Sequence, residues 1–299
     1  MTAILRTEGL SKRFGRHDVL NGLDLTVDEG SVYGLVGPNG AGKTTTVKLL
    51  MNIIEPSSGR AVVLDTDSLR LGPKQFQQIG YVSENQDMPD WMTVDYLMAY
   101  VKPFYPTWDD DRARELLRAF DLPGDRKLKH LSRGMQMKVS LASSLAYRPK
   151  LLVLDEPFTG LDPLVRDEFI EGLVECAEET TMLISSHDLA EIESFATHIG
   201  FLDRGRLQFS QSLSALSDRF REIEVTRDQP SSLPDAWPAH WLQPESSAGL
   251  IRFVDSHFER ERTLADVRRL FGESVRVADN TMSLRAIFVA LARQSRKAA

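Results

Sequence analysis

The sequence predicts an α/β protein that carries a second, smaller α/β domain after the first. Short apolar stretches with strand character alternate with helical stretches through the first two thirds of the chain. A glycine-rich turn at 37–42 joins one such strand to a helix, and a second apolar strand, 151–154, ends in two adjacent acids. Because 299 residues exceed the usual size of one domain, we expect a main domain at 1–215 and an accessory domain at 220–299.

Composition and charge narrow the class of protein. Hydrophobic residues make up 42% and charged residues 26%, as in ordinary globular proteins. The formal net charge of −7 disfavours non-specific binding to nucleic acid. No run of about 18 apolar residues occurs, so we expect no membrane span. The one cysteine, Cys176, lies in an apolar-periodic stretch, which predicts a buried thiol and fits the cytosol.

The first ninety residues predict strands around one central helix. Residues 23–27 alternate apolar and polar side chains, as a half-buried strand does. The strand at 31–36 runs into the glycine-rich turn, and a helix follows at 43–54, where Pro56 closes it. Two further short strands are expected at 61–64 and 79–82.

Residues 88–148 differ from their surroundings because they look helical and contain no convincing strand. Within this region Ala113, Leu116, Leu117 and Phe120 fall on one face of a helix. Either Asp109 or Asp110 is expected to cap the start of that helix. The region is therefore predicted as an all-helical insertion in the α/β domain.

Alternation resumes after the insertion. We expect strands at 151–154 and 182–185, helices at 165–178 and 189–195, and a hairpin whose tight turn is 203–205 between strands 199–202 and 206–209.

The accessory domain begins after Phe220. Residues 229–247 are rich in Pro, Ser and Trp and predict an irregular loop, and a strand is expected at 250–254. Thr263, with Asp266 three residues on, predicts the start of a helix, and Ser283 predicts the start of the last one.

The glycine-rich turn fits the pattern G-x-x-x-x-G-K-[ST] that cradles phosphates. Small residues let backbone N–H groups approach phosphate oxygens, and the helix that follows adds its positive dipole end. A turn that binds nothing is the alternative, but the position between a strand and a helix argues against it. The expected nucleotide-binding residues here are Gly37, Pro38, Asn39, Gly40, Ala41, Gly42, Lys43, Thr44 and Thr45.

Acidic residues complete the expected site. Asp155 and Glu156 follow a buried strand, so their carboxylates are expected at the edge of the sheet where ligands of α/β proteins bind. Asp155 is suited to the Mg²⁺ shell together with the Thr44 hydroxyl, and Glu156 to activating a water. His187 leaves a neighbouring strand and is expected to touch the γ-phosphate.

Taken together, these motifs resemble the ABC ATPase family over residues 1 to about 215. The family's LSGGQ motif is replaced here by Leu131-Ser132-Arg133-Gly134-Met135. The segment 160–162 resembles the D-loop, His187 the switch histidine, and Phe14 the aromatic residue that stacks on adenine. The order of these features along the chain is more specific than any one of them.

The resemblance implies a P-loop NTPase fold: a RecA-like α/β core with an antiparallel β subdomain and a helical subdomain. It implies ATP and Mg²⁺ as ligands, with Glu84 at the Q-loop position near the metal. It further implies that Ser132, Gly134 and Asp162 of one subunit complete the nucleotide site of a second subunit. The dimer is expected to be head-to-tail, either a homodimer or a heterodimer.

Three residues depart from the family pattern. Arg133 replaces a glycine, Met135 replaces a glutamine, and Glu84 stands where the Q-loop glutamine is expected, with Asn85 and Gln86 as nearby alternatives. Such departures resemble type 2 ABC exporters of bacteria, and most of all the ATPase subunits encoded with GntR-type regulators. That likeness extends to the segment 104–109 and, more loosely, to the last helix.

The resemblance implies an ATP-hydrolysing subunit that drives a separate membrane permease, favouring export, at the cytoplasmic face of the membrane. Residues 84–108 are rich in Met and aromatic side chains, as in grooves that receive a partner's helix, although about half of them are expected to pack internally. The alternative is a soluble ABC ATPase acting on nucleic acid or ribosomes. The accessory domain is expected to aid dimerisation or to act as a regulatory lid.

Overall fold

The computed structural model describes residues 2–84, 86–176, 180–227, 233–234, 237–247 and 249–297. The chain divides into two compact units, Met1–Ser210 and Gln211–Ala299. The side chain of Cys176 lies outside the described part of the chain, so its burial stays a prediction.

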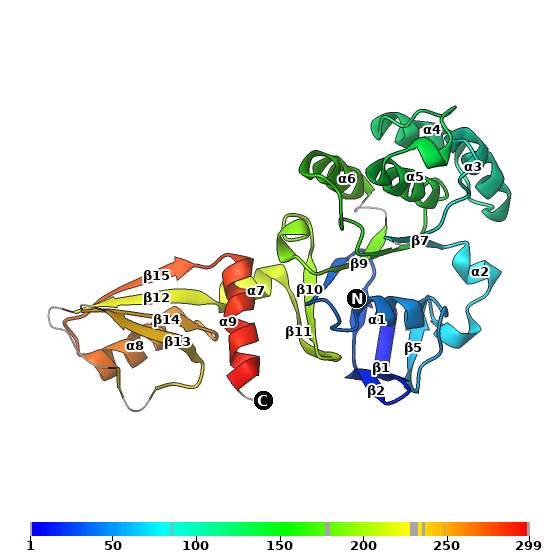
Figure 1. Ribbon diagram of the computed structural model, residues 1–299. Helices are drawn as coiled ribbons and strands as arrows, with labels where there is room; N and C mark the ends of the chain where they lie inside the picture. Colours follow the sequence, from blue (N-terminus) through cyan, green and yellow to red (C-terminus); the bar gives the residue numbers. More distant parts are fainter. Residues whose placement is uncertain are drawn as a thin grey trace. The chain divides into compact units, whose positions relative to one another are not determined.

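A six-stranded sheet forms the centre of the first unit and confirms the predicted α/β class (Figure 1). Its order is β11-β10-β4-β9-β8-β7, and the pairs from β10 to β7 are parallel. Strands β4, β8 and β9 are buried along their whole length, which explains their continuous apolar sequences. The strands are β4 (Val32–Val36), β7 (Ile79–Ser83), β8 (Leu151–Asp155), β9 (Thr181–Ser186), β10 (His198–Asp203) and β11 (Arg206–Ser212).

An antiparallel sheet packs near helix α1, as the resemblance implied, although most of its strands were not predicted individually. Its strands are β1 (Ala3–Phe14), β2 (His17–Leu23), β3 (Thr26–Asp28), β5 (Ser58–Val63) and β6 (Thr66–Asp67). The single strand expected at 23–27 is wrong, because the chain is interrupted between β2 and β3. There Thr7 of β1 donates its hydroxyl to Leu23 O and accepts from Leu25 N, both at 2.8 Å, in place of ladder bonds.

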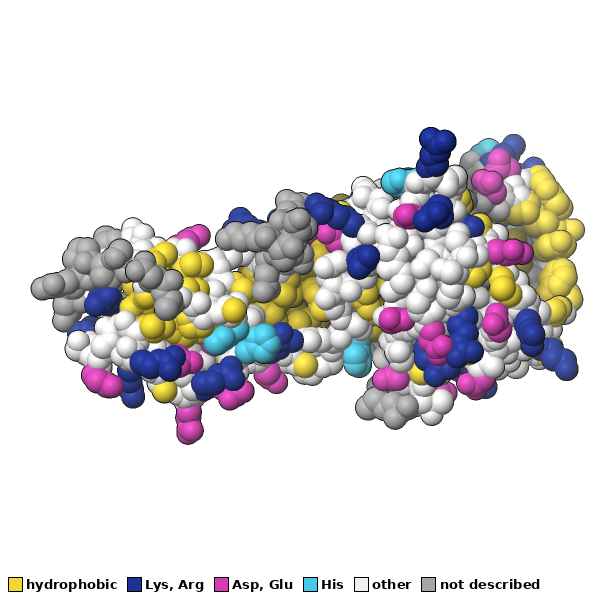
Figure 2. All heavy atoms as spheres, turned by 90° about the horizontal axis from the view of Figure 1, so that it is seen from below, with side chains coloured by type: hydrophobic (Ala, Val, Ile, Leu, Met, Phe, Trp, Pro, Cys, Tyr) yellow, Lys and Arg dark blue, Asp and Glu magenta, His cyan; other side chains and the backbone are white. Residues whose placement is uncertain are grey.

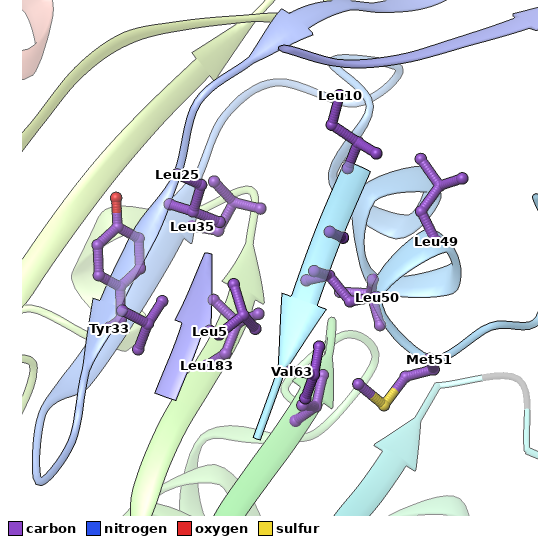
Figure 3. Packing of buried hydrophobic residues seen from close by; sticks show 14 of the residues in the cluster. Leu5, Leu10, Leu25, Tyr33, Leu35, Leu49, Leu50, Met51, Val63 and Leu183 are labelled. Atoms are coloured by element: carbon purple, nitrogen blue, oxygen red, sulfur yellow. The ribbon is translucent and has the colours of Figure 1, made fainter. Parts of the chain in front are cut away.

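One hydrophobic cluster fills the space between α1 and the sheets. Figure 3 shows Leu50 of α1, Leu5 of β1, Val63 of β5 and Leu183 of β9 gathered in this layer. Helix α1 (Lys43–Leu50) is shorter than the predicted 43–54 because Asn52 adopts a left-handed backbone with φ 54°. Packing of α1 on two sheets fixes the start of the helix, where the glycine-rich turn lies.

Helices gather beyond β7, as expected for residues 88–148 (Figure 1). They are α3 (Val94–Val101), α4 (Asp110–Ala119) and α5 (Arg133–Leu145), with short turns Lys102–Phe104 and Leu128–His130 between them. Asp109, and not Asp110, caps α4, because its carboxylate accepts from Asp111 N and Arg112 N at 3.0 Å.

The remaining helices of the first unit are short turns except for α6. They are η1 (Ser68–Arg70), α2 (Pro73–Phe76), α6 (Pro163–Cys176) and η4 (Leu189–Glu191). The prediction of a helix over 189–195 is wrong, because the observed helix η4 ends after one turn. Glu191 turns inward to accept a hydrogen bond from Ser186, and Ile192 leaves helical geometry with φ −124°.

The second unit contains a four-stranded antiparallel sheet with order β13-β14-β12-β15 and, among its described residues, the helices α7, α8 and α9 (Figure 1). Its core includes Trp241 and Phe253, whose rings stack with centroids 4.1 Å apart. The elements are α7 (Leu213–Arg219), β12 (Arg221–Thr226), β13 (Trp241–Ser247), β14 (Leu250–Asp255), α8 (Arg260–Phe271), β15 (Arg276–Thr281) and α9 (Leu284–Lys297).

Two expectations for this unit are corrected. The segment 229–247 is not all loop, since β13 begins at Trp241, although 228–232 and 235–236 lie outside the described residues. Thr263 does not begin a helix, because α8 already begins at Arg260. Thr263 is instead buried, and its hydroxyl donates at 2.5 Å to the fully buried carboxylate of Asp255.

Replacing Thr263 by Val should therefore lower the free energy of unfolding by about 1–3 kcal/mol, because the Asp255 carboxylate loses a donor inside the protein. Urea unfolding followed by tryptophan fluorescence measures this loss. The matched control is Thr226→Val on the exposed end of β12, which should change stability little. Equal effects of the two substitutions would contradict a supporting role for the Thr263 hydroxyl.

Candidate functional site

The glycine-rich turn lies between β4 and α1 and has no room for larger side chains at two positions. A Cβ at Gly37 would lie 2.0 Å from Leu202 O. Gly42 has φ 110°, and a Cβ there would lie 2.7 Å from a methyl group of Leu20. Glycine is therefore required at both positions by backbone conformation and close packing.

The hairpin turn at 203–205 supports this loop from outside. Gly205, with φ 73°, donates its N–H to Ala41 O at 3.1 Å and accepts from Asn21 N at 2.9 Å. A Cβ at Gly205 would lie 2.3 Å from Val19 O. The hairpin and β2 thus hold the glycine-rich turn in place.

The ammonium group of Lys43 donates hydrogen bonds to the backbone of the glycine-rich turn. The side chain is 4% exposed. Its Nζ donates to Gly37 O at 2.6 Å and Pro38 O at 3.1 Å, and it lies 3.1 Å from Glu156 Oε1. Such a buried cation requires these partners, because an unpaired one would be strongly unfavourable. A ligand with phosphate oxygens at the loop would meet this positive charge and the N-terminus of α1.

Asp155 and Thr44 lie side by side at the end of β8. Asp155 Oδ1 accepts from Thr44 Oγ1 at 3.1 Å and from Ser185 Oγ at 2.7 Å. Burial raises the pKa of Asp155, against the lowering effect of these hydroxyls. The pair presents two hard oxygen atoms beside the phosphate loop.

Glu156 is held between two basic groups. Its Oε2 lies 2.8 Å from His187 Nδ1, and its backbone has the left-handed φ of 52°. Burial alone would raise the pKa of Glu156, but the His187 hydrogen bond and the Lys43 charge bring it below its ordinary value. The same hydrogen bond, which His187 donates to the carboxylate, raises the pKa of His187.

A cleft of about 600 Å³ opens over these groups. Nine residues expected at the site line it: Asn39, Gly40, Gly42, Lys43, Thr44, Thr45, Glu84, Glu156 and His187. Three further lining residues were not anticipated, namely His17, Val19 and Thr159. His17 and Val19 belong to β2, and no local motif marks them. Thr159 does carry a signal, since it follows Glu156 by three residues and donates to it at 3.3 Å.

Other expected residues do not line this cleft. Ser132 caps α5, accepting from Met135 N at 3.3 Å, and Asp162 accepts from Val165 N at 3.1 Å at the start of α6. A Cβ at Gly134 would lie 2.6 Å from a methyl group of Val165, so this glycine allows α5 to approach α6. These residues have local roles, and the structure does not bring them to the Lys43 cleft.

Phe14 ends β1 outside the residues that line the cleft, half-exposed, with Lys12 Nζ 4.9 Å from its ring centroid. Its stacking on adenine stays a prediction. Of the alternatives to Glu84, Asn85 lies outside the described residues. Gln86 instead accepts from Ser140 Oγ at 2.8 Å and does not line the cleft.

Two of the departures from the family pattern form one ion pair. The guanidinium of Arg133, at the start of α5, bonds the carboxylate of Glu84, whose backbone N–H donates to Asp155 O at 3.1 Å. The neutral glutamine and the glycine of the usual pattern could not make this pair. Arg133 also covers Gly160, where a Cβ would lie 2.9 Å from its Nη1. The pair therefore ties the start of α5 to the wall of the cleft.

Comparisons with known proteins agree on one family. Residues 20–159 match the model of the ABC transporter family. The ABC transporter ATP-binding protein YtrB of Bacillus subtilis is 35% identical over 221 residues, which are 73% of this chain and 75% of that protein. The Nod factor export ATP-binding protein I of Cupriavidus metallidurans is 33% identical over 214 residues, 69% and 70% of the two chains.

A solved structure of an ATP-binding subunit of an ABC transporter superposes with a TM-score of 0.66 at 28% identity. The match covers 72% of this chain and 92% of that one. Among the described residues, no helix combines the length and the hydrophobicity needed to cross a bilayer.

The His187–Glu156 pair predicts a pH-dependent contribution to stability. The stabilisation that comes from protonated His187 is fully present below pH 6.5, the ordinary pKa of His. It is lost as the pH rises through the raised pKa of His187. The stabilisation that comes from ionised Glu156 is present above pH 4.5, the ordinary pKa of Glu, and is lost as pH falls through the lowered pKa.

The difference in melting temperature between the wild type and His187→Gln should therefore be largest at about pH 5.5 and small by about pH 9. Thermal unfolding without nucleotide, over that pH range, measures it. His198→Gln on β10 is the matched control. A difference that grew with rising pH would contradict the pairing.

Proposed function

The chain belongs to the ABC transporter ATP-binding proteins, a family of ATPases, and on that premise we propose that it drives a separate membrane permease in the direction of export. The observation that carries the proposal is the meeting of Lys43, Thr44 and Glu156 at one cleft, with Asp155 hydrogen-bonded to Thr44 behind it. Support for export comes from the relatives, one of which is named as an export ATP-binding protein. We also propose that the ATPase domain spans residues 1–215 and the accessory domain residues 220–299.

The phosphate chain of ATP is expected to bind the glycine-rich turn. Backbone N–H groups of the loop and the Lys43 ammonium would neutralise the β- and γ-phosphates. Because phosphate oxygens and Glu156 both attract Lys43, a bound triphosphate would compete for the 3.1 Å ion pair. Binding of ATP would then release Glu156 from Lys43 and leave its hydrogen bond with His187 in place.

The Asp155–Thr44 pair fits a magnesium ion. Mg²⁺ favours oxygen ligands and is usually held by one or two carboxylates together with substrate phosphates and waters. We propose Thr44 and Asp155 as ligands, with Glu84 near the shell. The ion would supply charge neutralisation to the phosphates.

Glu156 is the proposed general base. Once released from Lys43, its carboxylate can accept a proton from the water that attacks the γ-phosphate, and the hydrogen bond with His187 still lowers its pKa. His187, at 2.8 Å from Glu156, would orient that carboxylate and contact the γ-phosphate. Thr159 donates to the same carboxylate and is a further positioning residue.

A second subunit is proposed to complete the site. Ser132, Gly134 and Asp162 do not line the Lys43 cleft of their own chain, but Ser132 and Gly134 lie at the N-terminus of the 13-residue helix α5. Helix N-termini attract anions. We propose that this end of α5 caps ATP held by a head-to-tail partner, in a homodimer or a heterodimer. Loss of the γ-phosphate would then loosen the dimer.

A groove of about 390 Å³ beside α3 and α5 is the proposed permease contact. Ile53, Phe76 and Tyr105 line it, and Ile53 is 52% exposed. Hydrophobic side chains gather at the right-hand end of Figure 2, where Figure 1 places α2 and α3. Exposed apolar surface of this kind suits an amphipathic helix of a membrane protein. Such docking would place the chain at the cytoplasmic face of the membrane.

Replacing Glu156 by Gln should keep ATP binding but lower turnover by about 100-fold or more, because the base is lost. Size-exclusion chromatography with light scattering should then show an ATP-dependent dimer. Lys43→Ala is the control, since it should lose ATP affinity and stay monomeric. Normal turnover in the Glu156 variant, or a monomer under all conditions, would count against the proposed role.

Replacing Ile53 by Glu should abolish association with membranes that contain the permease while leaving basal ATPase activity unchanged, because a charge would enter the apolar groove. Co-sedimentation with membranes from the native host measures the first property and phosphate release the second. The matched control is Val174→Glu on α6, an exposed apolar position outside the groove. If the two variants bind membranes equally, the groove is not the contact.

A further inference from the structure

A second cleft, of about 500 Å³, lies wholly within the C-terminal unit. Its walls come from the last residue of α7, the turn before β13, the connection from β14 to α8, the first turn of α8, and α9. Four of its side chains are basic or imidazole groups: Arg219, His240, His257 and Arg262. Figure 2 shows the histidine side chains of this unit together on its surface, next to Arg or Lys side chains.

No carboxylate side chain is among the described residues that line this cleft. The nearest acid in sequence, Asp255, is fully buried and is occupied by His257 N at 2.9 Å and by Thr263. Glu259 pairs with Nη1 of Arg262 at 3.1 Å, and Nη2 of Arg262 donates one of its hydrogens to His257 O. The lining is therefore positively charged within a chain of net charge −7.

Hydrogen bonds orient the basic groups and use only some of their donors. Arg219 donates through Nε to Ser256 O at 2.7 Å and through Nη2 to His257 Nε2 at 3.0 Å. Because His257 Nε2 accepts, its proton lies on Nδ1, facing Ser256 Oγ at 3.1 Å. Within the described residues, the Nη1 group of Arg219 makes no hydrogen bond. A guanidinium held in this way is already positioned to bind an anion.

His240 gives a second, independent indication of a ligand. Its Nε2 atom is buried and has no hydrogen-bond partner among the described residues. Its ring lies 6.1 Å from that of His257, centroid to centroid. Buried ring nitrogens are nearly always paired, so an unpaired one on the wall of a basic cleft points to a missing acceptor or donor.

We propose that this cleft binds a phosphate group. The guanidinium groups of Arg219 and Arg262 and the imidazole of His240 face it from several directions, which suits a tetrahedral dianion, while His257 holds the Arg219 guanidinium in place. The cleft volume exceeds that of inorganic phosphate, and Ala239 and Leu291 add apolar lining. The natural ligand is therefore a phosphate monoester with an organic portion, either a small metabolite or the headgroup of a lipid.

The test uses the full chain with Trp91 and Trp108 replaced by Phe, so that emission comes from Trp237 and Trp241 of the C-terminal unit. Trp241 is a suitable reporter because its ring lies 6.0 Å from that of His240. Inorganic phosphate is titrated at constant ionic strength, with saturating ADP and Mg²⁺ to occupy the other cleft. A second arm titrates phosphatidylcholine vesicles with and without phosphatidic acid.

Matched variants separate charge from shape. Ala239 is exposed on the cleft wall, so Ala239→Glu adds a negative charge without removing a contact, and Ala239→Gln adds nearly the same volume without charge. Arg262→Gln removes a guanidinium from the cleft, and Arg260→Gln removes one that pairs with Asp279 outside it.

Saturable binding of phosphate is expected in the parent, Ala239→Gln and Arg260→Gln proteins, weakened at least about tenfold in Ala239→Glu and Arg262→Gln. The same pattern with phosphatidic acid vesicles alone would also support the site and assign the phosphate to a lipid. If neither probe gives saturable binding, or if Ala239→Glu and Ala239→Gln titrate alike, the proposal is wrong.

Discussion

The arrangement of the nucleotide site depends on the contacts that the buried ammonium group of Lys43 makes. This group holds the carbonyls of Gly37 and Pro38 on one side and the carboxylate of Glu156 on the other. A cation so far from water is tolerated only with such partners. The loop, the end of β8 and the His187 segment are thereby fixed around one charge. Phosphate oxygens that enter the site must therefore bind the Lys43 ammonium group more favourably than its present oxygen partners do.

The sequence predicted the central α/β sheet and the residues around Lys43 because both carry local signals. Fully buried strands have continuous apolar sequences, and a phosphate loop needs glycine where Gly37 and Gly42 stand. The resemblance implied an antiparallel subdomain, but strand β1 was not predicted because it mixes polar and apolar residues along its twelve positions. His17 and Val19 were missed because only the hairpin of that sheet brings them to the cleft.

Long-range pairing explains the other errors. Thr263 has the sequence of a helix start, yet its hydroxyl serves the buried carboxylate of Asp255 on another element. Glu84 and Arg133 both depart from the family pattern, but they are 49 residues apart in the sequence. Their sequence positions therefore do not predict a contact, and the ion pair is evident only in the folded structure. Because that pair joins the wall of the nucleotide cleft to the start of α5, a movement of either segment must stretch or break it.

The tight turn at 203–205 has a consequence for protein engineering. Exposed hairpin turns are usually good places to insert an epitope tag or a fluorescent reporter, since extra residues there disturb little. In this chain Gly205 is wedged against β2 and bonded to Ala41 of the phosphate loop. Added length at that hairpin would pull directly on the loop. Fusion partners therefore belong at other surface positions, and a survey of variant chains should find the length of this hairpin constant.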